Sequence, residues 1–496
     1  MYTLKRLLLT GFINLIGLTV FAQTEWVIQY HERPVGKNLL TNKEITAKEI
    51  VFPLDIYHVY PDTLSNCITL QIRGKSKNGK YYNDEGWFTI FDLAKDTAKW
   101  LKAISYPVSG IVQQGNLIVQ VIGNKSYRLN PENGEEQWEV KNTFSYVDFD
   151  HQIALGYKIK TFRDINNTLE GIDLRNGQVL WKREMDHEFG WDKVMRLNDS
   201  CLMIVSSGLH EVNVKNGTGW DYDTPTGLSN GARSVGGIAS NVLMDNTDLY
   251  FAAKEQIARL NHQGQIIWSA PLPLDLTSQS ILFKMDDRIG MINTGYVDMG
   301  VLYHDNVPFI AAFDIKTGHQ LYVSRSSVKN DIVHGFHISE DAISLIFKDR
   351  ISKYSLQDGA LISEKAYNTE NYGELDCFAD RTTYFKKDST YQSLILSDTT
   401  RHFIFTKKDK ILVINDQLEI VEQLDSKDLY TCYLQYKDYR FLEKANHAIV
   451  IDNNSKVVAE AELSKYSKLI GTKLFDVHEQ KFLVVDIDDV INNNLP

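Results

Sequence analysis

Cysteine is scarce in this chain. Its four cysteines, Cys67, Cys201, Cys377 and Cys432, lie far apart among 496 residues. These spacings match neither a Cys-x-x-Cys redox motif nor a zinc cluster, and no Cys-x-x-Cys-His sequence is present to attach a haem. Each thiol is most simply a small core residue. One or two disulfides would suit an oxidising compartment, but the sequence does not pair them.

Proline and linkers are also scarce. The chain has only 10 prolines, and no Pro-, Ser- or Gly-rich linker or low-complexity run divides it. Length alone would suggest three domains. The missing linkers instead favour one large array over residues 23–496.

Long hydrophobic runs are missing after residue 22. Lys5 and Arg6 precede a mostly apolar run over residues 7–20, and Ala22 ends a cleavage signature, so residues 1–22 are predicted to be a secretory signal peptide. A membrane anchor is the alternative, although the run is interrupted and shorter than the ~20 apolar residues of a span. No cysteine lies near Ala22, so no acylation is expected there. We therefore expect a periplasmic or secreted protein without a transmembrane segment.

An excess of basic residues is missing as well. The 53 Lys and Arg are outnumbered by 64 Asp and Glu, for a formal net charge of -11. An acidic surface argues against nucleic acid and anionic membranes as partners. Hydrophobic residues make up 43% and aromatics 11%, which is enough for extensive cores.

What the chain has in quantity is one repeated turn. In residues 171–181 an apolar run leads to Asp173, whose carboxylate can accept hydrogen bonds from the next backbone amides. Asn176 and Gly177 tolerate the positive φ of a tight turn, and the returning run ends in Trp181. This pattern predicts a β-hairpin with an aromatic wedge.

The turn recurs along most of the chain. Its short polar, glycine and aromatic positions are Asp92 and Trp100; Asn130, Gly134 and Trp138; Asp173, Gly177 and Trp181; Asn213, Gly217 and Trp220; Gly264 and Trp268; Asp314, Gly318 and Tyr322; and Gly359. Eroded copies follow at residues 413–416 and 450–454. The polar positions are 38 to 53 residues apart, close to the length of a four-stranded propeller blade.

These observations predict an all-β chain that forms a single β-propeller of four-stranded blades, with eight blades or, as the alternative, seven. The architecture is WD40-like, and strands from the two ends of the mature chain would pair to close it. Trp138, Trp181, Trp220 and Trp268 should be buried between blades. A solenoid of parallel coils is disfavoured, because Asn-Gly turns join antiparallel strands.

The repeated pattern resembles the blade signature of the PQQ-like β-propellers. That family includes quinoprotein alcohol dehydrogenases and the propeller lipoprotein of the outer-membrane barrel assembly machinery. The resemblance is best in residues 173–181 and 314–318 and covers residues 85–365. In this family Asp, Gly and Trp lock neighbouring blades together, so the resemblance implies a fold and not an activity.

Two departures from the family bear on cofactors. Its quinoprotein dehydrogenases carry a disulfide between adjacent cysteines and hold calcium with Glu, Asn and Asp, whereas no two cysteines here are neighbours and no such ligand set can be assigned. We therefore expect no cofactor, neither PQQ nor calcium. The barrel-assembly lipoprotein needs a lipidated cysteine, which this chain lacks.

One segment is a candidate binding loop, with Trp220, Asp221, Tyr222, Asp223 and Asn230 as its key residues. The acidic pair could hold a cation and the rings could stack on a sugar or peptide. The alternative is that Trp220 is a blade wedge and the rest an ordinary loop.

Other candidate sites are weaker. A second loop covers residues 293–306, on the same face if both bind. His334 and His337 have a helical metal-ligand spacing, but a strand would place them on opposite faces. No Ser/His/Asp triad can be assigned from a local motif, although distant residues can assemble one.

The sequence favours a non-catalytic binding scaffold of the cell envelope that presents end loops to a protein or glycan partner. The alternative is a propeller enzyme, either a quinoprotein-like oxidoreductase or a lyase or hydrolase that uses the central funnel.

Overall fold

The structure is a computed structural model. It describes residues 28–62, 64–65, 67–95, 97–105, 109–161, 164–185, 191–206, 208–223, 238–245, 248–253, 256–272, 279–295, 297–298, 302–303, 307–326, 328, 331–378, 384–386, 401–454 and 456–491. The predicted signal peptide and Asn230 lie outside these residues. The chain divides into two compact units. Unit 1 comprises residues 1–119, 129–135 and 433–496, and unit 2 comprises residues 120–128 and 136–432.

Four-stranded antiparallel sheets dominate the described residues, and there are eight of them. Seven follow the order of the chain, apart from one hairpin insertion. They comprise β3 (Asp55–Pro61), β4 (Cys67–Lys75), β5 (Tyr82–Asp92) and β6 (Thr97–Ser105); β7 (Ser109–Gln114), β8 (Leu117–Ile122), β9 (Lys125–Leu129) and β10 (Glu136–Val140); β11 (Thr143–Asp148), β12 (Ile153–Thr161), β13 (Asp164–Asp173) and β14 (Val179–Glu184); β15 (Lys193–Arg196), β16 (Cys201–Val205), β17 (Gly208–Asn213) and β18 (Asp221–Asp223); β19 (Leu243–Asp245), β20 (Asp248–Ala252), β21 (Gln256–Leu260) and β22 (Ile266–Pro271); β23 (Ser280–Met285), β24 (Arg288–Asn293), β27 (Phe309–Asp314) and β28 (Gln320–Arg325); and β29 (Gly335–Ile338), β30 (Ala342–Ile346), β31 (Arg350–Ser355) and β32 (Leu361–Ala366).

The eighth four-stranded sheet contains β33 (Leu375–Phe378), β35 (Arg401–Thr406), β36 (Lys410–Asn415) and β37 (Ile420–Asp425). Two smaller pairings complete the sheets of unit 2. One joins β25 (Val297–Asp298) and β26 (Leu302–Tyr303), and the other joins β34 (Tyr384–Lys386) to the first residues of β38 (Leu429–Tyr436).

In unit 1 a larger sheet brings strands from the two ends of the chain together. Its strands lie in the order β39 (Tyr439–Lys444), β40 (His447–Ile451), β41 (Val457–Ala461), β1 (Gln29–Asn38), β2 (Glu44–Val51), β44 (Lys481–Asp486), β43 (Lys473–His478) and β42 (Lys468–Ile470). Lys37 of β1 pairs with Glu460 of β41, and Glu49 of β2 pairs with Leu483 of β44. The expected pairing between the chain ends is therefore present, and these strands come in addition to the eight four-stranded sheets.

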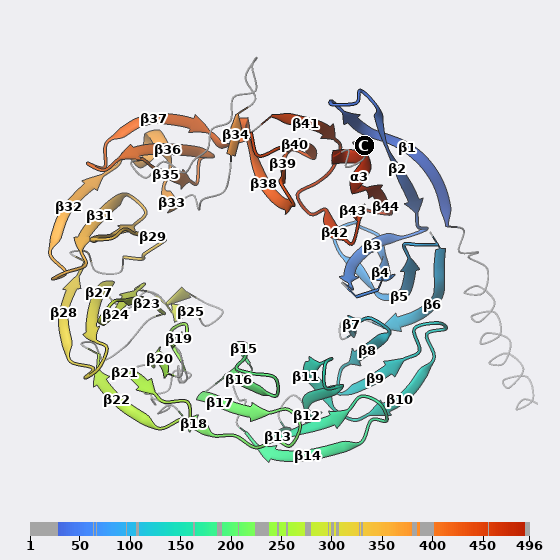
Figure 1. The fold of residues 1–496 in the computed structure, drawn as a ribbon, viewed down its shortest axis with the longest axis horizontal. Coiled ribbons are helices and arrows are strands. Elements are labelled where there is room, and N and C mark those ends of the chain that lie inside the picture. Colours follow the sequence, from blue (N-terminus) through green and yellow to red (C-terminus); the bar gives the residue numbers. More distant parts are fainter. Residues whose placement is uncertain are drawn as a thin grey trace, which may run out of the picture. The chain divides into compact units, whose positions relative to one another are not determined.

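Within unit 2 the sheets follow one another along an arc. Figure 1 shows the last strand of each sheet, such as β14, β22, β28 and β32, on the outside of this arc. The second strands are nearly continuous apolar runs, because neighbouring sheets cover both of their faces. In β16, for example, Leu202, Met203 and Ile204 are fully buried. The last strands are the most exposed, as β32 illustrates.

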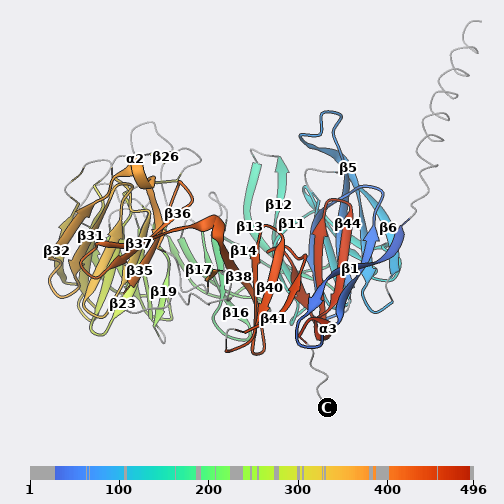
Figure 2. The same cartoon turned by 90° about the horizontal axis from the view of Figure 1, so that it is seen from above.

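Helices are few and short in the part of the chain that the structure describes. They are α2 (Thr369–Tyr372), α3 (Ile487–Ile491) and a 3-10 turn at Ser426–Asp428. No helix in the described ranges is long and apolar enough to cross a membrane. Figure 2, seen from above, shows the strands of each sheet running side by side, with α2 at one end. The prediction of an all-β chain built from four-stranded propeller-type sheets is confirmed.

Candidate functional site

The repeated turn has the same geometry in every copy. Asp173 Oδ1 accepts a hydrogen bond from the amide of Arg175 at 2.9 Å, and Asp314 Oδ1 accepts one from Lys316 at 3.0 Å. The same contact occurs in the two eroded copies, at Asn415 and Asp452. A hydrogen bond from the Arg175 side chain lowers the pKa of Asp173, so this turn carboxylate is ionised at neutral pH.

In six copies the aromatic residue of the repeat locks its sheet to the next one. Trp181 Nε1 donates to the Val214 carbonyl at 2.8 Å, and the ring lies on Gly217, which has a φ of +74°. A Cβ built on Gly217 would lie 2.4 Å from the ring, so the position requires glycine for space as well as for backbone conformation. Equivalent contacts join Trp100 to Pro131 and Gly134, Trp138 to Leu174 and Gly177, Trp220 to His262 and Gly264, Trp268 to Ile315 and Gly318, and Tyr322 to Leu356 and Gly359.

Burial of the four predicted wedges is uneven. Trp181 and Trp268 are 9% and 8% exposed, whereas Trp138 and Trp220 are only partly buried. The copy that carries Ser363 uses a different ring, because Tyr367 Oη donates to the Leu418 carbonyl at 2.7 Å. Sequence reasoning missed Tyr367, since it falls outside the spacing of the repeat.

The predicted binding loop is largely engaged in packing. Trp220 Nε1 lies 2.8 Å from Glu211 Oε2 and 2.9 Å from the His262 carbonyl. The Tyr222 ring packs edge-on against Phe251. Asp221 forms an ion pair with Arg183 at 2.7 Å. Of the four candidate residues that the structure describes, Asp223 is exposed and takes part in none of these contacts.

The structure assembles a Ser/His/Asp constellation that no local motif indicated. His210 Nδ1 lies 2.7 Å from Asp221 Oδ1, and His210 Nε2 lies 3.0 Å from Ser206 Oγ. The register of β16, β17 and β18 places both Ile204 and Asp221 opposite His210, and Ser206 follows the last residue of β16. Burial would raise the pKa of Asp221, but hydrogen bonds from His210 and Arg183 outweigh it and lower this pKa. His210 is 1% exposed and Ser206 8% exposed, whereas the Asp221 side chain is 38% exposed.

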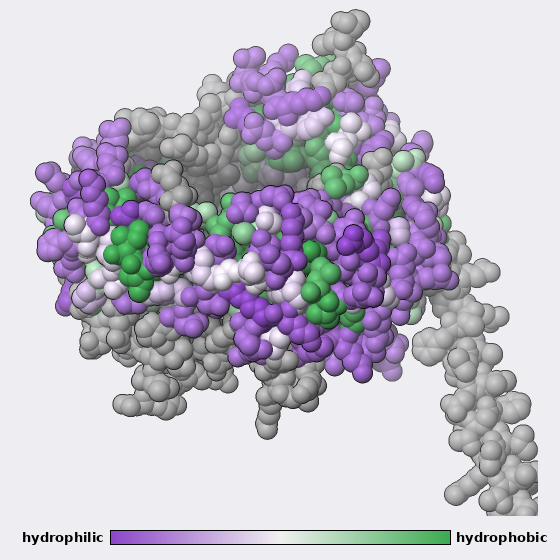
Figure 3. Space-filling view, turned by 60° about the horizontal axis from the view of Figure 1, so that its bottom comes forward, coloured by the Kyte–Doolittle hydropathy of each residue, from purple (hydrophilic) through white to green (hydrophobic). Residues whose placement is uncertain are grey.

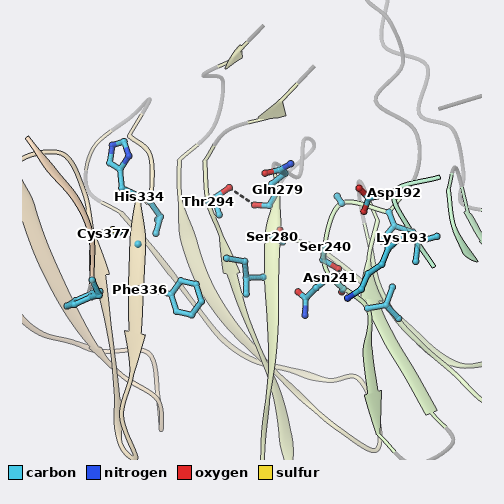
Figure 4. A pocket seen from close by; sticks show the side chains of 18 residues that line it. Asp192, Lys193, Ser240, Asn241, Gln279, Ser280, Thr294, His334, Phe336 and Cys377 are labelled. Carbon is cyan, nitrogen blue, oxygen red and sulfur yellow. Dashed lines mark hydrogen bonds between the residues drawn. The ribbon is translucent and has the colours of Figure 1, made fainter. Parts of the chain in front are cut away.

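A cavity of about 770 Å³ in unit 2 is the main candidate site. Innermost strands or the segments leading into them contribute from five successive sheets, those of β15, β19, β23, β29 and β33. Its polar lining includes Asp192, Lys193, Ser240, Asn241, Gln279, Thr294 and His334, and its apolar lining includes Val205, Ile238, Ile281, Phe336 and Phe378. Figure 4 shows the Lys193 side chain extending towards Asn241 and the Phe336 ring directed into the space between the strands.

The wall of this cavity is held rigidly. Asn241 acts as a backbone mimic, since its amide donates to the Leu282 carbonyl at 3.0 Å and its Oδ1 accepts from the Leu282 amide at 2.7 Å. Ser240 Oγ accepts from the Ala252 amide at 2.8 Å, and Thr294 Oγ1 donates to the Gln279 carbonyl at 2.6 Å. These bonds tie residues 238–242 to two sheets, so the cavity is preformed.

The two histidines with metal-ligand spacing, His334 and His337, lie in different surroundings. His334 lines the cavity, and burial, with a smaller effect of Lys407, lowers its pKa. The His337 ring instead lies 4.6 Å from that of His402, measured between centroids. Among the described residues no group of three or more His, Cys, Asp or Glu could hold a metal ion. No disulfide joins any two of the four cysteines in the structure.

A comparison with protein families matches part of the repeat region. Residues 81–270 match the family model described as outer membrane protein assembly factor BamB. No curated protein sequence matches the chain significantly.

Solved structures show distant similarity. BamB from Moraxella catarrhalis is 12% identical, with 71% of this chain and 96% of that chain covered and a TM-score of 0.32. The computationally designed protein Ika8 is 11% identical, with 74% and 97% covered and a TM-score of 0.29. A eukaryotic initiation factor is 11% identical, with 69% and 89% covered and a TM-score of 0.36. These sequence identities and TM-scores are too low to bear on function. The match over residues 81–270 is to a family of PQQ-like β-propeller repeats.

Proposed function

We propose that this protein is a non-catalytic binding scaffold of the cell envelope, exported by residues 1–22, that holds an extended segment of a partner protein in the cavity of unit 2. The observation that carries the proposal is the preformed cavity of about 770 Å³. Its volume lies in the range of ligand sites, and both apolar and polar side chains line it.

The strands around the cavity suit a polypeptide. Among the described residues, β15, β19, β29 and β33 each end their sheet and have one edge without a sheet neighbour. The inner edge of β23 is already engaged, because the Ser280 amide donates to the Ala239 carbonyl and Asn241 bonds to Leu282. A bound chain that donates and accepts backbone hydrogen bonds could satisfy such edges. The exposed Lys193 and Asp192 at the margin would select charge on the partner.

A glycan fits less well. Sugar recognition would use exposed aromatic faces, and the rings expected for that purpose, Trp220 and Tyr222, are occupied by Gly264 and Phe251. The family model over residues 81–270 is described as an outer-membrane protein assembly factor, which supports an envelope role with a protein partner.

The proposal is tested by capture from envelope extract with the tagged chain that starts at residue 23. Lys193→Glu reverses a charge at the margin of the cavity and should reduce recovery of the partner at least about tenfold, which corresponds to about 1.4 kcal/mol. Lys316→Glu is the matched control, because Lys316 lies in the exposed turn between β27 and β28. Equal recovery with both variants, or recovery of glycan without protein, would argue against a protein partner in this cavity.

A second candidate is a serine hydrolase, favoured by the distances from Asp221 through His210 to Ser206. In that arrangement His210 would accept the Ser206 proton while Asp221 fixes the imidazole tautomer. A fluorophosphonate probe would form a covalent adduct with Ser206 in the full chain, and Ser206→Ala would abolish it. If the parent chain is labelled no more than the Ser206→Ala variant, the hydrolase proposal fails. The hydrogen bonds among Ser206, His210 and Asp221 would then serve only to join strands.

A further inference from the structure

The outermost strands share a bulge that exposes an aliphatic side chain. In β32, Tyr354 pairs with Leu361 and Lys353 pairs with Ser363, which leaves Ile362 bulged and 54% exposed. The same position in the other sheets holds Leu180, Ile267, Leu321 and Val421, which are 43% to 52% exposed. The face drawn in Figure 3 is mostly hydrophilic and carries separate apolar patches.

One copy of this bulge is covered, and the chain itself provides the cover. In β41 the bulged residue is Val458, which is only 1% exposed. Strand β1 lies antiparallel along β41, and the Leu39 amide donates to the Val458 carbonyl at 2.8 Å. Val35 and Val458 belong to the same buried cluster. An added strand is therefore what buries this position.

The covering strand has a recognisable sequence. Gly36 is required because a Cβ there would lie 2.0 Å from the Glu460 carbonyl oxygen. Lys37 then lies opposite Glu460, and Val35 before the glycine supplies the apolar contact. The strand that covers β41 thus carries an aliphatic residue, a glycine and a basic residue in succession, in extended conformation.

Strand β32 is the uncovered copy that most resembles β41. In β14, β22 and β28 the residue after the bulge is an aromatic ring overlain by a turn glycine of the next sheet, as Gly318 overlies Trp268. In β32 this residue is Ser363, and no described glycine lies against it. The equivalent of Glu460 is Glu364, so the acidic position is also retained. Figures 1 and 2 both place β32 at the outer margin of unit 2.

We propose that the outer edge of β32 binds an extended, antiparallel segment of a partner protein that carries an aliphatic residue, a glycine and a lysine or arginine in succession. The partner would extend the sheet β29-β30-β31-β32 by one strand, bury Ile362 and place its basic side chain opposite Glu364. This site is separate from the cavity and does not depend on it.

The probe is a fluorescent peptide with the sequence of residues 31–41, which contains Val35, Gly36 and Lys37. Fluorescence anisotropy with the full chain should show saturable binding, and Ile362→Asp should weaken it at least about tenfold. Leu321→Asp is the matched control, because it changes the bulged residue of β28, where Gly359 overlies the adjacent Tyr322 ring. Circular dichroism checks that both variants remain folded.

A second peptide separates strand pairing from nonspecific apolar contact. N-methylation of the Leu39 amide removes the donor that β1 uses towards β41, and binding should fall by a similar factor. Binding that survives both Ile362→Asp and N-methylation would overturn the proposal. Displacement of β1 from β41 by the peptide would overturn it as well, because the peptide would then bind β41 and not β32. Equal loss with Leu321→Asp would also overturn it, because the site would then not be specific to β32.

Discussion

Replacing Trp181 by alanine probes the lock between two sheets. The indole is 9% exposed and its Nε1 donates to the Val214 carbonyl. Loss of a buried tryptophan costs about 3 to 5 kcal/mol, and the unpaired carbonyl places Trp181→Ala near the upper end of this range. The adjacent Leu180 is 46% exposed, so Leu180→Ala should change the free energy of unfolding by less than about 0.5 kcal/mol.

A double-mutant cycle with Gly217→Ala tests the contact itself. In the parent chain the new Cβ would lie 2.4 Å from the ring, which adds about 1 to 3 kcal/mol of overpacking to about 1 to 2 kcal/mol for the positive φ. With Trp181 already replaced, only the backbone cost remains. Gly79→Ala is the control, because Gly79 has a φ of +67° and no atom within 4 Å of its added Cβ.

The free energies of unfolding come from urea titrations followed by circular dichroism, which does not depend on the tryptophan removed. The double variant should lose about 1 to 3 kcal/mol less free energy of unfolding than the two single variants lose together, because the clash disappears with the ring. Additivity within about 0.5 kcal/mol would refute the contact between Trp181 and Gly217.

Two further predictions concern the hydroxyl of Tyr367 and the buried imidazoles. Tyr367→Phe should lower the free energy of unfolding by about 1 to 2 kcal/mol in the same titration, because the Leu418 carbonyl loses its 2.7 Å donor; an unchanged value would remove Tyr367 from the lock. Burial lowers the pKa of His334 and also of His402, where the neighbouring His337 adds to the effect. Their stabilising contribution is therefore complete above about pH 6.5 and is lost as pH falls through the lower folded pKa values. The thermal midpoint should drop between pH 7 and pH 5, and the drop should be smaller in His334→Gln; the same drop in both proteins would contradict this assignment.

Local chemistry made the repeated turns readable from the sequence. An Asp, Asn or Ser that accepts the amide two residues later, followed by a glycine with positive φ, is determined within about six residues. Asp173 and Gly177 illustrate this, and the same contact at Asn415 shows that the polar residue alone suffices when the glycine is lost. The aromatic wedge is less strictly placed, because Tyr367 reaches the next sheet from another position.

The candidate sites depend on contacts between distant residues, which no local pattern contains. The cavity draws on residues from Asp192 to Phe378 in five sheets, and its lining shares no repeated motif. Likewise, His210 and Asp221 meet because β17 and β18 pair in register, and Ser206 reaches His210 from the residue after β16. The loop residue Trp220 shows the opposite case, since an apparent binding residue is a wedge between sheets.

The most direct test of the binding role is site-specific photo-crosslinking in the envelope. A photoreactive side chain at Gln279, which is exposed in the cavity, should capture one discrete protein, and the same group at His319, in the exposed turn before β28, should not. Lys193→Glu should abolish the Gln279 adduct. No adduct at Gln279, or the same adduct from both positions, would contradict a protein-binding cavity.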